Sequence, residues 1–218
     1  MADVDSRDGK TYATHAILET LGRIHAPHDD ALEWAFTAPG RTKLPAIQVG
    51  PNEGKLLSVF VRLAAATRVV EVGTLAGYSG LWMARALPEG GRLYTIDHDP
   101  EAIAVARETF ERGGVLDKVT LVNADGVEGL DSIAGEGPFD LMFVDADKAR
   151  YDRYGAWAAA NLRKGGLLVA DNTFFFGRLL DADDPAAAGV RRFHEAAARD
   201  FETASIPTPD GMVVGIRR

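Results

Sequence analysis

The chain has 218 residues, with 24 Lys and Arg against 32 Asp and Glu and a formal net charge of −8. This acidic balance, with no stripe of basic residues, argues against a nucleic-acid partner. Cysteine is absent, which excludes disulfides, thiolate metal sites and cysteine nucleophiles and makes a cytoplasmic location the expected one. The N-terminal residues are polar rather than signal-like, and no apolar run approaches the roughly 18 residues that span a bilayer, so we expect no membrane partner.

The hydrophobic pattern predicts helices at the N-terminal end of the chain. Residues 11–38 are expected to form one or two helices, which end at the Ala-Pro-Gly break of residues 38–40, and residues 53–66 form another. Between them, residues 43–52 form a loop with two prolines. Such a loop either crosses the mouth of a site or, in the simpler interpretation, is a plain surface connection.

From residue 68 onward, strands alternate with helices. The expected strands are 68–72, 91–97, 118–123, 141–144, 165–170, 202–206 and 212–217. The expected helices are 79–87, 100–112, 127–133, 150–162 and 186–200. This alternation predicts an α/β fold with a Rossmann-like, doubly wound, seven-stranded sheet of mostly parallel strands. The last two strands would form a hairpin that places one antiparallel strand in the sheet. No repeat or linker divides the chain, so a single domain, 1–218, is expected.

Two of the expected strands end in residues that suit a metal ion. Asp145 follows one buried strand, with Lys148 close behind it, and Asp171 and Asn172 follow the next strand. In open α/β sheets, ligands bind at the edge formed by the carboxyl ends of the strands. Asp145, Asp171 and Asn172 offer only oxygen donors, which suit a hard cation such as Mg²⁺, or alternatively Mn²⁺ or Ca²⁺.

The first strand runs into a glycine-rich turn with the spacing Gly73-x-x-x-Gly77-x-x-Gly80. Such a turn lets a ligand approach the backbone and opens onto a helix N-terminus. The spacing differs from the Gly-x-Gly-x-x-Gly of dinucleotide enzymes. An NAD-type oxidoreductase is still an alternative, because it is also an α/β nucleotide binder, but it leaves the polar strand ends unexplained.

Three acids accompany this turn. Glu71 precedes it, Asp97 ends the second strand, where an acid can accept hydrogen bonds from a ribose, and Asp125 follows the third strand within reach of an adenine edge. The alternative role for Asp97 is a helix cap before Pro100. His98 is the one histidine expected near a nucleoside, and the other four are interpreted as surface residues.

Four segments together resemble a known family: VVEVGTLAGYSG, YTIDHDP, FDLMFVDADKARYDRY and LLVADN. They are similar to the cation-dependent O-methyltransferases that use S-adenosylmethionine, the group of caffeoyl-CoA and catechol methyltransferases and their bacterial small-molecule relatives. The resemblance runs from about residue 46 to the C-terminus. It implies the class I methyltransferase fold and a homodimer, with residues 1–66 as a helical cap on the acceptor side. The expected acceptor is a catechol-like or other polyhydroxylated aromatic small molecule.

The resemblance also implies roles for individual residues. Lys148 matches the catalytic base of the family. The matching metal ligands are Asp145, Asp171 and Asn172. The positions that contact the methyl donor S-adenosylmethionine are Glu71, Gly73, Tyr78, Ser79, Asp97, Asp125 and Asp145. The alternative for Lys148 is a surface ion pair with Asp147 or Asp152.

The sequence departs from the family just after Asn172. The family usually has an aliphatic residue and a tryptophan before a glycine, whereas this chain has Thr173-Phe174-Phe175-Phe176-Gly177. The three phenylalanines form either an aromatic wall over a planar acceptor or part of core or dimer packing. The acceptor therefore stays open among catechols, flavonoids, hydroxycinnamoyl thioesters and natural-product intermediates. A catalytically silent S-adenosylmethionine-binding protein is a further alternative.

Overall fold

The computed structural model describes residues 4–218. Within these residues, seven strands form one sheet in the order β3-β2-β1-β4-β5-β7-β6. The strands are β1 (Arg68–Val72), β2 (Arg92–Asp97), β3 (Val119–Asn123), β4 (Phe139–Val144), β5 (Leu162–Ala170), β6 (Phe201–Ile206) and β7 (Met212–Arg217). Strands β1 to β5 pair in parallel, and β7 runs antiparallel to both of its neighbours. The predicted mostly parallel α/β sheet with a C-terminal hairpin is therefore confirmed.

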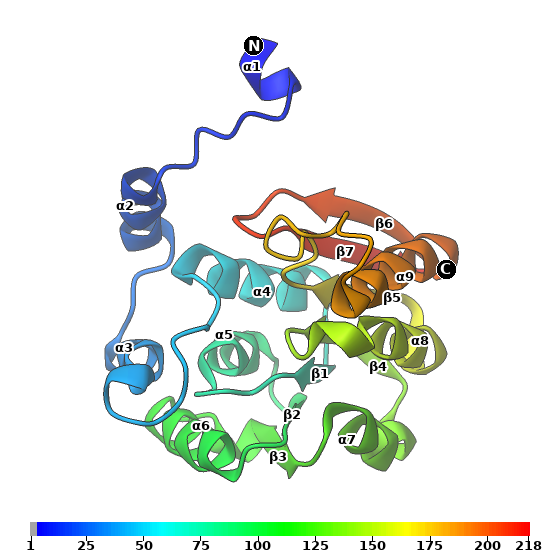
Figure 1. The fold of residues 1–218 in the computed structure, drawn as a ribbon. Helices are drawn as coiled ribbons and strands as arrows, with labels where there is room; N and C mark the ends of the chain where they lie inside the picture. The colour runs from blue at the N-terminus through cyan, green and yellow to red at the C-terminus, as the bar shows by residue number, and fades with distance from the viewer. Residues whose placement is uncertain (1–3) are drawn as a thin grey trace.

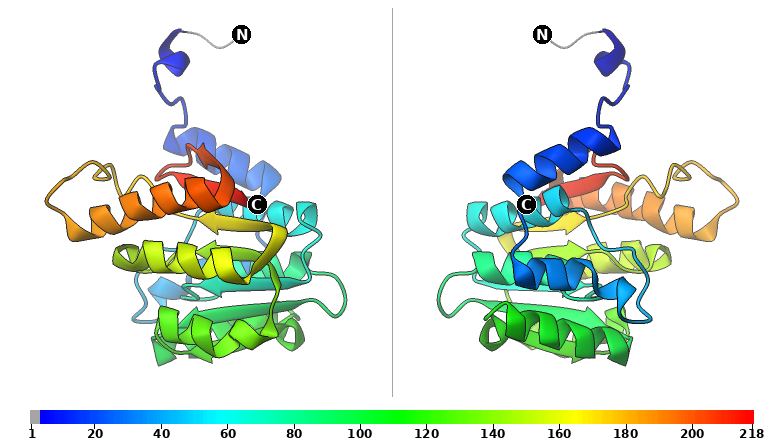
Figure 2. Two further views of the ribbon diagram at one scale, coloured as in Figure 1. Left: turned by 90° about the vertical axis from the view of Figure 1, so that its right-hand side faces the viewer. Right: turned by 90° about the vertical axis from the view of Figure 1, so that its left-hand side faces the viewer.

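Helices cover both faces of the sheet (Figure 1). One face carries α4 (Pro51–Leu63), α5 (Tyr78–Ala86) and α6 (Pro100–Arg112), and the other carries α7 (Gly126–Ile133), α8 (Tyr151–Asn161) and α9 (Pro185–Asp200). Before them come α1 (Val4–Arg7), α2 (His15–His25) and α3 (Asp30–Phe36), and α1 stands away from the body (Figure 2). Short 3₁₀ turns are η1 (Ala38–Gly40), η2 (Leu116–Lys118), η3 (Ala134–Glu136) and η4 (Lys148–Arg150). From residue 4 onward, no helix combines the length and apolar character needed to cross a bilayer.

Local chemistry sets where several helices begin. The carboxylates that cap α3, α6, α7 and α9 by accepting backbone N–H bonds are Asp29, Asp99, Asp125 and Asp184. Proline occupies the first turn of α4, α6 and α9, where its missing N–H costs no helix hydrogen bond. These signals explain why the helix boundaries follow the sequence pattern closely.

The central strands are buried on both faces. In β4, Leu141 and Phe143 pack with the helices of one face, while Met142 and Val144 pack with those of the other. This two-sided burial explains why β4 is a continuous apolar run rather than an alternating one.

The loops after β1 and β4 touch at the carboxyl edge of the sheet. Gly73 has φ +102°, and a Cβ at this position would overlap the backbone carbonyl oxygen of Asp145. Only glycine combines this left-handed conformation with so close an approach. The glycine turn and the polar end of β4 are therefore held against each other.

Candidate active site

A cavity of about 790 Å³ lies at the carboxyl edge of the sheet. It collects most of the residues that the sequence singled out. Those that line it are Gly73, Tyr78, Ser79, Asp97, Asp125, Asp145, Lys148 and Asn172. Glu71 and Asp171 are buried behind its wall, with exposed fractions of 0% and 4%.

Asp97 is held by the glycine turn. Its Oδ2 accepts hydrogen bonds from the backbone N–H groups of Thr74 and Leu75, at 3.1 and 2.9 Å, and its Oδ1 accepts one from Asp99 at 3.0 Å. The helix cap of α6 is Asp99 and not Asp97, so the capping alternative for Asp97 is wrong. Asp97 thus presents an oriented carboxylate at the end of β2, as a ribose site requires.

Glu71 supports the cavity from behind. Its two oxygens accept hydrogen bonds from Ser79 Oγ at 2.5 Å and Thr95 Oγ1 at 2.6 Å. Complete burial raises the pKa of Glu71 to about 7, although both hydroxyl groups act in the opposite direction. A direct contact of Glu71 with the donor stays a prediction, while its hold on Ser79 is an observed contact.

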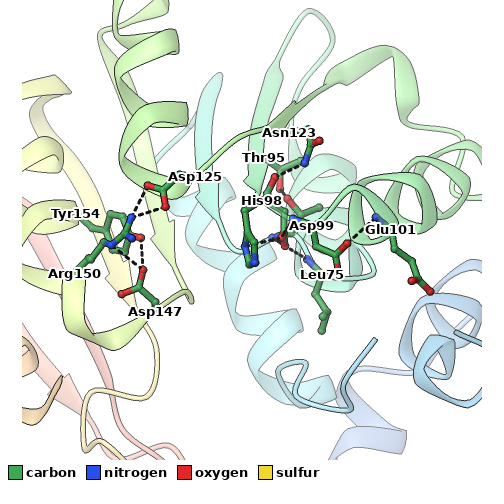
Figure 3. A network of polar contacts seen from close by, with 12 residues as sticks. Leu75, Thr95, His98, Asp99, Glu101, Asn123, Asp125, Asp147, Arg150 and Tyr154 are labelled. Carbon is green, nitrogen blue, oxygen red and sulfur yellow. Dashed lines mark hydrogen bonds and ion pairs between the residues drawn. The ribbon is translucent and has the colours of Figure 1, made fainter. Parts of the chain in front are cut away.

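Asp125 is paired with Arg150, a residue to which the sequence pattern assigned no role. Both carboxylate oxygens accept from Arg150 Nη1 at 2.5 Å, and Oδ1 also caps α7 through the Val127 N–H at 3.1 Å (Figure 3). The Arg150 guanidinium is the main cause that lowers the pKa of Asp125. Arg150 itself lines the cavity.

Lys148 is bound inside the site. Its Nζ donates to Asp145 Oδ1 at 2.9 Å and to the Tyr151 hydroxyl at 2.7 Å, and the side chain is only 12% exposed. The predicted alternative of a surface ion pair with Asp147 or Asp152 is wrong. Those two carboxylates pair instead with Arg150 and Arg192.

Asp171 carries an unsatisfied buried oxygen. Its Oδ1 has no hydrogen-bond partner among residues 4–218. Burial, and then the charges of Asp145 and Glu53, raise the pKa of Asp171 to about 7. Asn172 follows with φ +52°, and its Nδ2 lies 3.5 Å from Asp171 Oδ2. A buried anionic oxygen without a partner, with further acids nearby, fits a cation site because a cation would satisfy that oxygen and offset the charge.

The donor set is small. The described residues, 4–218, contain no group of three or more His, Cys, Asp or Glu side chains placed to hold a metal ion. A cation here would therefore depend on two carboxylates and one amide oxygen, from Asp145, Asp171 and Asn172. Such a set leaves coordination positions for water and a substrate oxygen.

His28 was expected on the surface, and this expectation is wrong. Its Nε2 lies 2.7 Å from the Tyr78 hydroxyl and its Nδ1 lies 2.9 Å from Glu33 Oε2. The ring also packs against Phe36, whose own ring contacts Tyr78. Because His28 and Tyr78 are 50 positions apart, no local pattern could have paired them. His194 was likewise expected on the surface, but its Nε2 lies 2.9 Å from the carbonyl oxygen of Thr173.

Two segments form the mouth of the cavity. Leu44, Pro45 and Ile47 line it, so the loop of residues 43–52 borders the cavity and is more than a surface connection. The second segment contains two neighbouring phenylalanines that differ in burial. Phe175 is buried in the core, whereas Phe176 lines the cavity and is 66% exposed. The core alternative is therefore confirmed for Phe175, and contact of Phe176 with an acceptor stays a prediction.

Comparison with known proteins decides the family. The profile of the O-methyltransferase family matches residues 29–218. A catechol O-methyltransferase from Niastella koreensis is 42% identical over 213 residues, which cover 93% of this chain and 95% of that protein. The chain belongs to the O-methyltransferase family.

Solved structures resemble this O-methyltransferase over nearly its whole length. The O-methyltransferase TomG from Streptomyces achromogenes, involved in tomaymycin synthesis and solved in complex with SAM, matches with a TM-score of 0.88 and 34% identity, over 93% of this chain and 96% of its own. An O-methyltransferase from Bacillus cereus in complex with SAH matches with a TM-score of 0.89 and 31% identity, over 93% and 97%. The resemblance drawn from the four sequence segments is thus confirmed, and the oxidoreductase alternative is set aside.

Proposed function

We propose that this O-methyltransferase transfers a methyl group from S-adenosylmethionine to one hydroxyl of a catechol-like aromatic small molecule, with a divalent cation at the active site. One observation carries the proposal: Lys148, at the cavity wall, is tied through Tyr151 to Asp171, whose buried oxygen has no partner among residues 4–218. The residues proposed as proton acceptor and as cation ligands thereby lie at the same edge of the sheet. Homodimerisation, the acceptor-side role of residues 1–66 and a cytoplasmic location stay predictions.

The donor would occupy the glycine-turn side of the cavity. Asp97 is oriented to accept from a ribose, and Gly73 leaves the backbone open to close approach. Related proteins solved with SAM or SAH support this choice of donor. The sulfonium methyl would then lie toward the end of β4, close to the turn η4 that begins at Lys148.

The acceptor needs activation because a phenol is a weak nucleophile. With a pKa near ~10, only about 0.1% of a phenol is ionised at pH 7, a deficit of roughly 4 kcal/mol. A divalent cation held by Asp145, Asp171 and Asn172 would stabilise the phenolate as a Lewis acid and orient the two hydroxyls.

Lys148 would act as the base that takes the hydroxyl proton. The oxygen then forms its bond to the methyl carbon while the carbon–sulfur bond breaks, which leaves S-adenosylhomocysteine. Asp145, 2.9 Å from Lys148 Nζ, stabilises the resulting ammonium, and the Tyr151 hydroxyl holds the amine in place. Ile47 and Phe176 offer apolar surface at the mouth for the aromatic ring.

The test is methyl transfer to caffeic acid, run with Mg²⁺ and with EDTA, beside a monohydroxy analogue. We expect product that disappears in EDTA, returns with Mg²⁺ and is absent with the monohydroxy compound. Equal activity in EDTA would remove the cation from the reaction. Absence of transfer to every acceptor of a diol panel, with the donor bound, would favour the catalytically silent alternative.

A further inference from the structure

Arg150 links two helix N-termini along one wall of the donor cavity. Its Nη1 donates to both oxygens of Asp125 at the start of α7, and its Nε lies 3.4 Å from Asp147 Oδ2 just before η4. The Tyr154 hydroxyl donates to the same Asp147 oxygen at 3.2 Å. All four residues line the cavity, and Figure 3 shows them as one group.

A second group faces this wall across the cavity. It contains Leu75, His98 and Asp99, which surround the end of β2 (Figure 3). Asp97, at the end of β2, is oriented for a ribose by the hydrogen bonds from Thr74 and Leu75. Because both groups line one cavity, a nucleoside whose ribose reaches Asp97 could place its base against the wall that carries Arg150.

Asp125 is poorly placed to receive that base by itself. Both of its oxygens accept from Arg150, and Oδ1 also accepts from the Val127 N–H. These three bonds use most of the roughly four lone-pair sites of the carboxylate, so an adenine amino group would find only one left, on Oδ2. The side chains of Arg150 and Asp125 are 40% and 37% exposed, so the guanidinium is open to the cavity together with its partner.

The guanidinium is held in a way that suits stacking. Asp125 and Asp147 engage its edge, which leaves its flat faces free of these carboxylates. A planar guanidinium stacks on aromatic rings, which a lysine ammonium cannot do. We propose that Arg150, rather than Asp125, is the residue of this wall that contacts the adenine ring of the methyl donor, and that Asp125 and Asp147 position it. This inference rests on the proposed use of S-adenosylmethionine.

The test is calorimetric binding of S-adenosylhomocysteine to the full chain and to variants. Arg150→Ala should raise Kd by about 2- to 30-fold, the range of a cation–π contact. Arg150→Lys keeps the charge but loses the plane, and should not restore affinity. Arg192→Ala is the matched control, because Arg192 also pairs with an aspartate but does not line the donor cavity.

A second ligand separates Arg150 from Asp125. The 6-oxo analogue, S-inosylhomocysteine, lacks the amino group that Asp125 would accept from. We expect Asp125→Asn to leave the ratio of the two Kd values unchanged. A ratio that collapses in Asp125→Asn would assign the base to Asp125 and overturn the inference.

The remaining outcomes are equally decisive. Affinity unchanged in Arg150→Ala, or restored in Arg150→Lys, would show that the guanidinium plane makes no contact with the base. If Arg150→Ala fails to fold, a Kd for Arg150→Lys raised to the predicted range supports the inference. Failure of the unsubstituted enzyme to bind S-adenosylhomocysteine would instead overturn the proposed donor, and the inference with it.

Discussion

The Tyr151 hydroxyl donates a 2.8 Å hydrogen bond to the backbone carbonyl of Asp171. The same hydroxyl accepts from Lys148 Nζ at 2.7 Å. Tyr151 begins α8 and Asp171 follows β5, so one fully buried phenol joins the two parts of the candidate active site. The position of the proposed base and that of the proposed metal ligand are therefore coupled.

Tyr151→Phe should reduce catalysis more than donor binding. The substitution keeps the ring packing but removes a hydrogen bond from Lys148 and leaves a buried carbonyl of Asp171 without this donor. Losing such a bond costs about 1–3 kcal/mol, so we expect kcat to fall by about 10-fold and the midpoint of thermal unfolding to decrease. Steady-state kinetics and thermal melts measure the two effects. An unchanged kcat would show that Lys148 needs no support from Tyr151.

Asp171→Ala should abolish activity while donor binding persists. The buried carboxylate is a proposed ligand of the cation, and Asp171 does not line the donor cavity. We expect methyl transfer to drop by at least about 100-fold, the upper range for changes around a metal site, with the Kd for S-adenosylhomocysteine within about twofold. Asp183→Ala, an exposed aspartate in the loop before α9, is the control and should behave normally. If activity survived in Asp171→Ala, the metal site would lie elsewhere.

Glu71→Gln should flatten the pH dependence of stability between pH 5 and 8. The pKa of Glu71 is about 7 in the folded protein, because of burial, against about 4.3 in the unfolded chain. The folded state binds this proton more tightly, so the contribution of Glu71 to stability is complete below about pH 4 and is lost as the pH rises through about 7. The difference corresponds to a free energy on the order of 4 kcal/mol.

Urea titrations at pH 5 and pH 8 measure this effect. The unsubstituted protein should lose more unfolding free energy between the two pH values than Glu71→Gln does. Asp171, whose pKa is also raised to about 7, contributes equally to both proteins and cancels in the comparison. An identical pH slope in the two proteins would contradict the assigned titration of Glu71.

Phe176→Ala should weaken acceptor binding without changing stability. Phe176 is 66% exposed and lines the cavity mouth, so its removal deletes apolar contact with an aromatic acceptor but little core packing. We expect the acceptor KM to rise by about 5-fold or more and the unfolding free energy to stay within about 0.5 kcal/mol. Leu180→Ala is matched to it, because Leu180 is 87% exposed in the same loop but does not line the cavity. Equal KM values for the two variants would remove Phe176 from acceptor recognition.

Much of the fold and of the site followed from local signals. Apolar runs that end in a polar residue revealed the strands and their carboxyl ends, because a strand buried on both faces must be apolar along its length. Aspartates and prolines before helical patterns revealed the helix starts. Asp97, Asp145, Lys148, Asp171 and Asn172 stand directly at or after such strand ends, so a parallel sheet necessarily brings them to one edge.

Other features depended on the tertiary structure. The partners Asp125 and Arg150 are 25 positions apart, and His28 and Tyr78 are 50 apart. Neither pair has a periodic pattern, because each bond forms only where separate loops and helices pack together. The difference in burial between Phe175 and Phe176 also depended on the backbone. Both residues take a left-handed conformation, with φ +52° and +54°, which the sequence does not signal. By itself, the sequence determined the sheet and the chemistry at its edge, because strand ends are local features of the chain. The tertiary structure alone decided which distant side chains hold those groups in place.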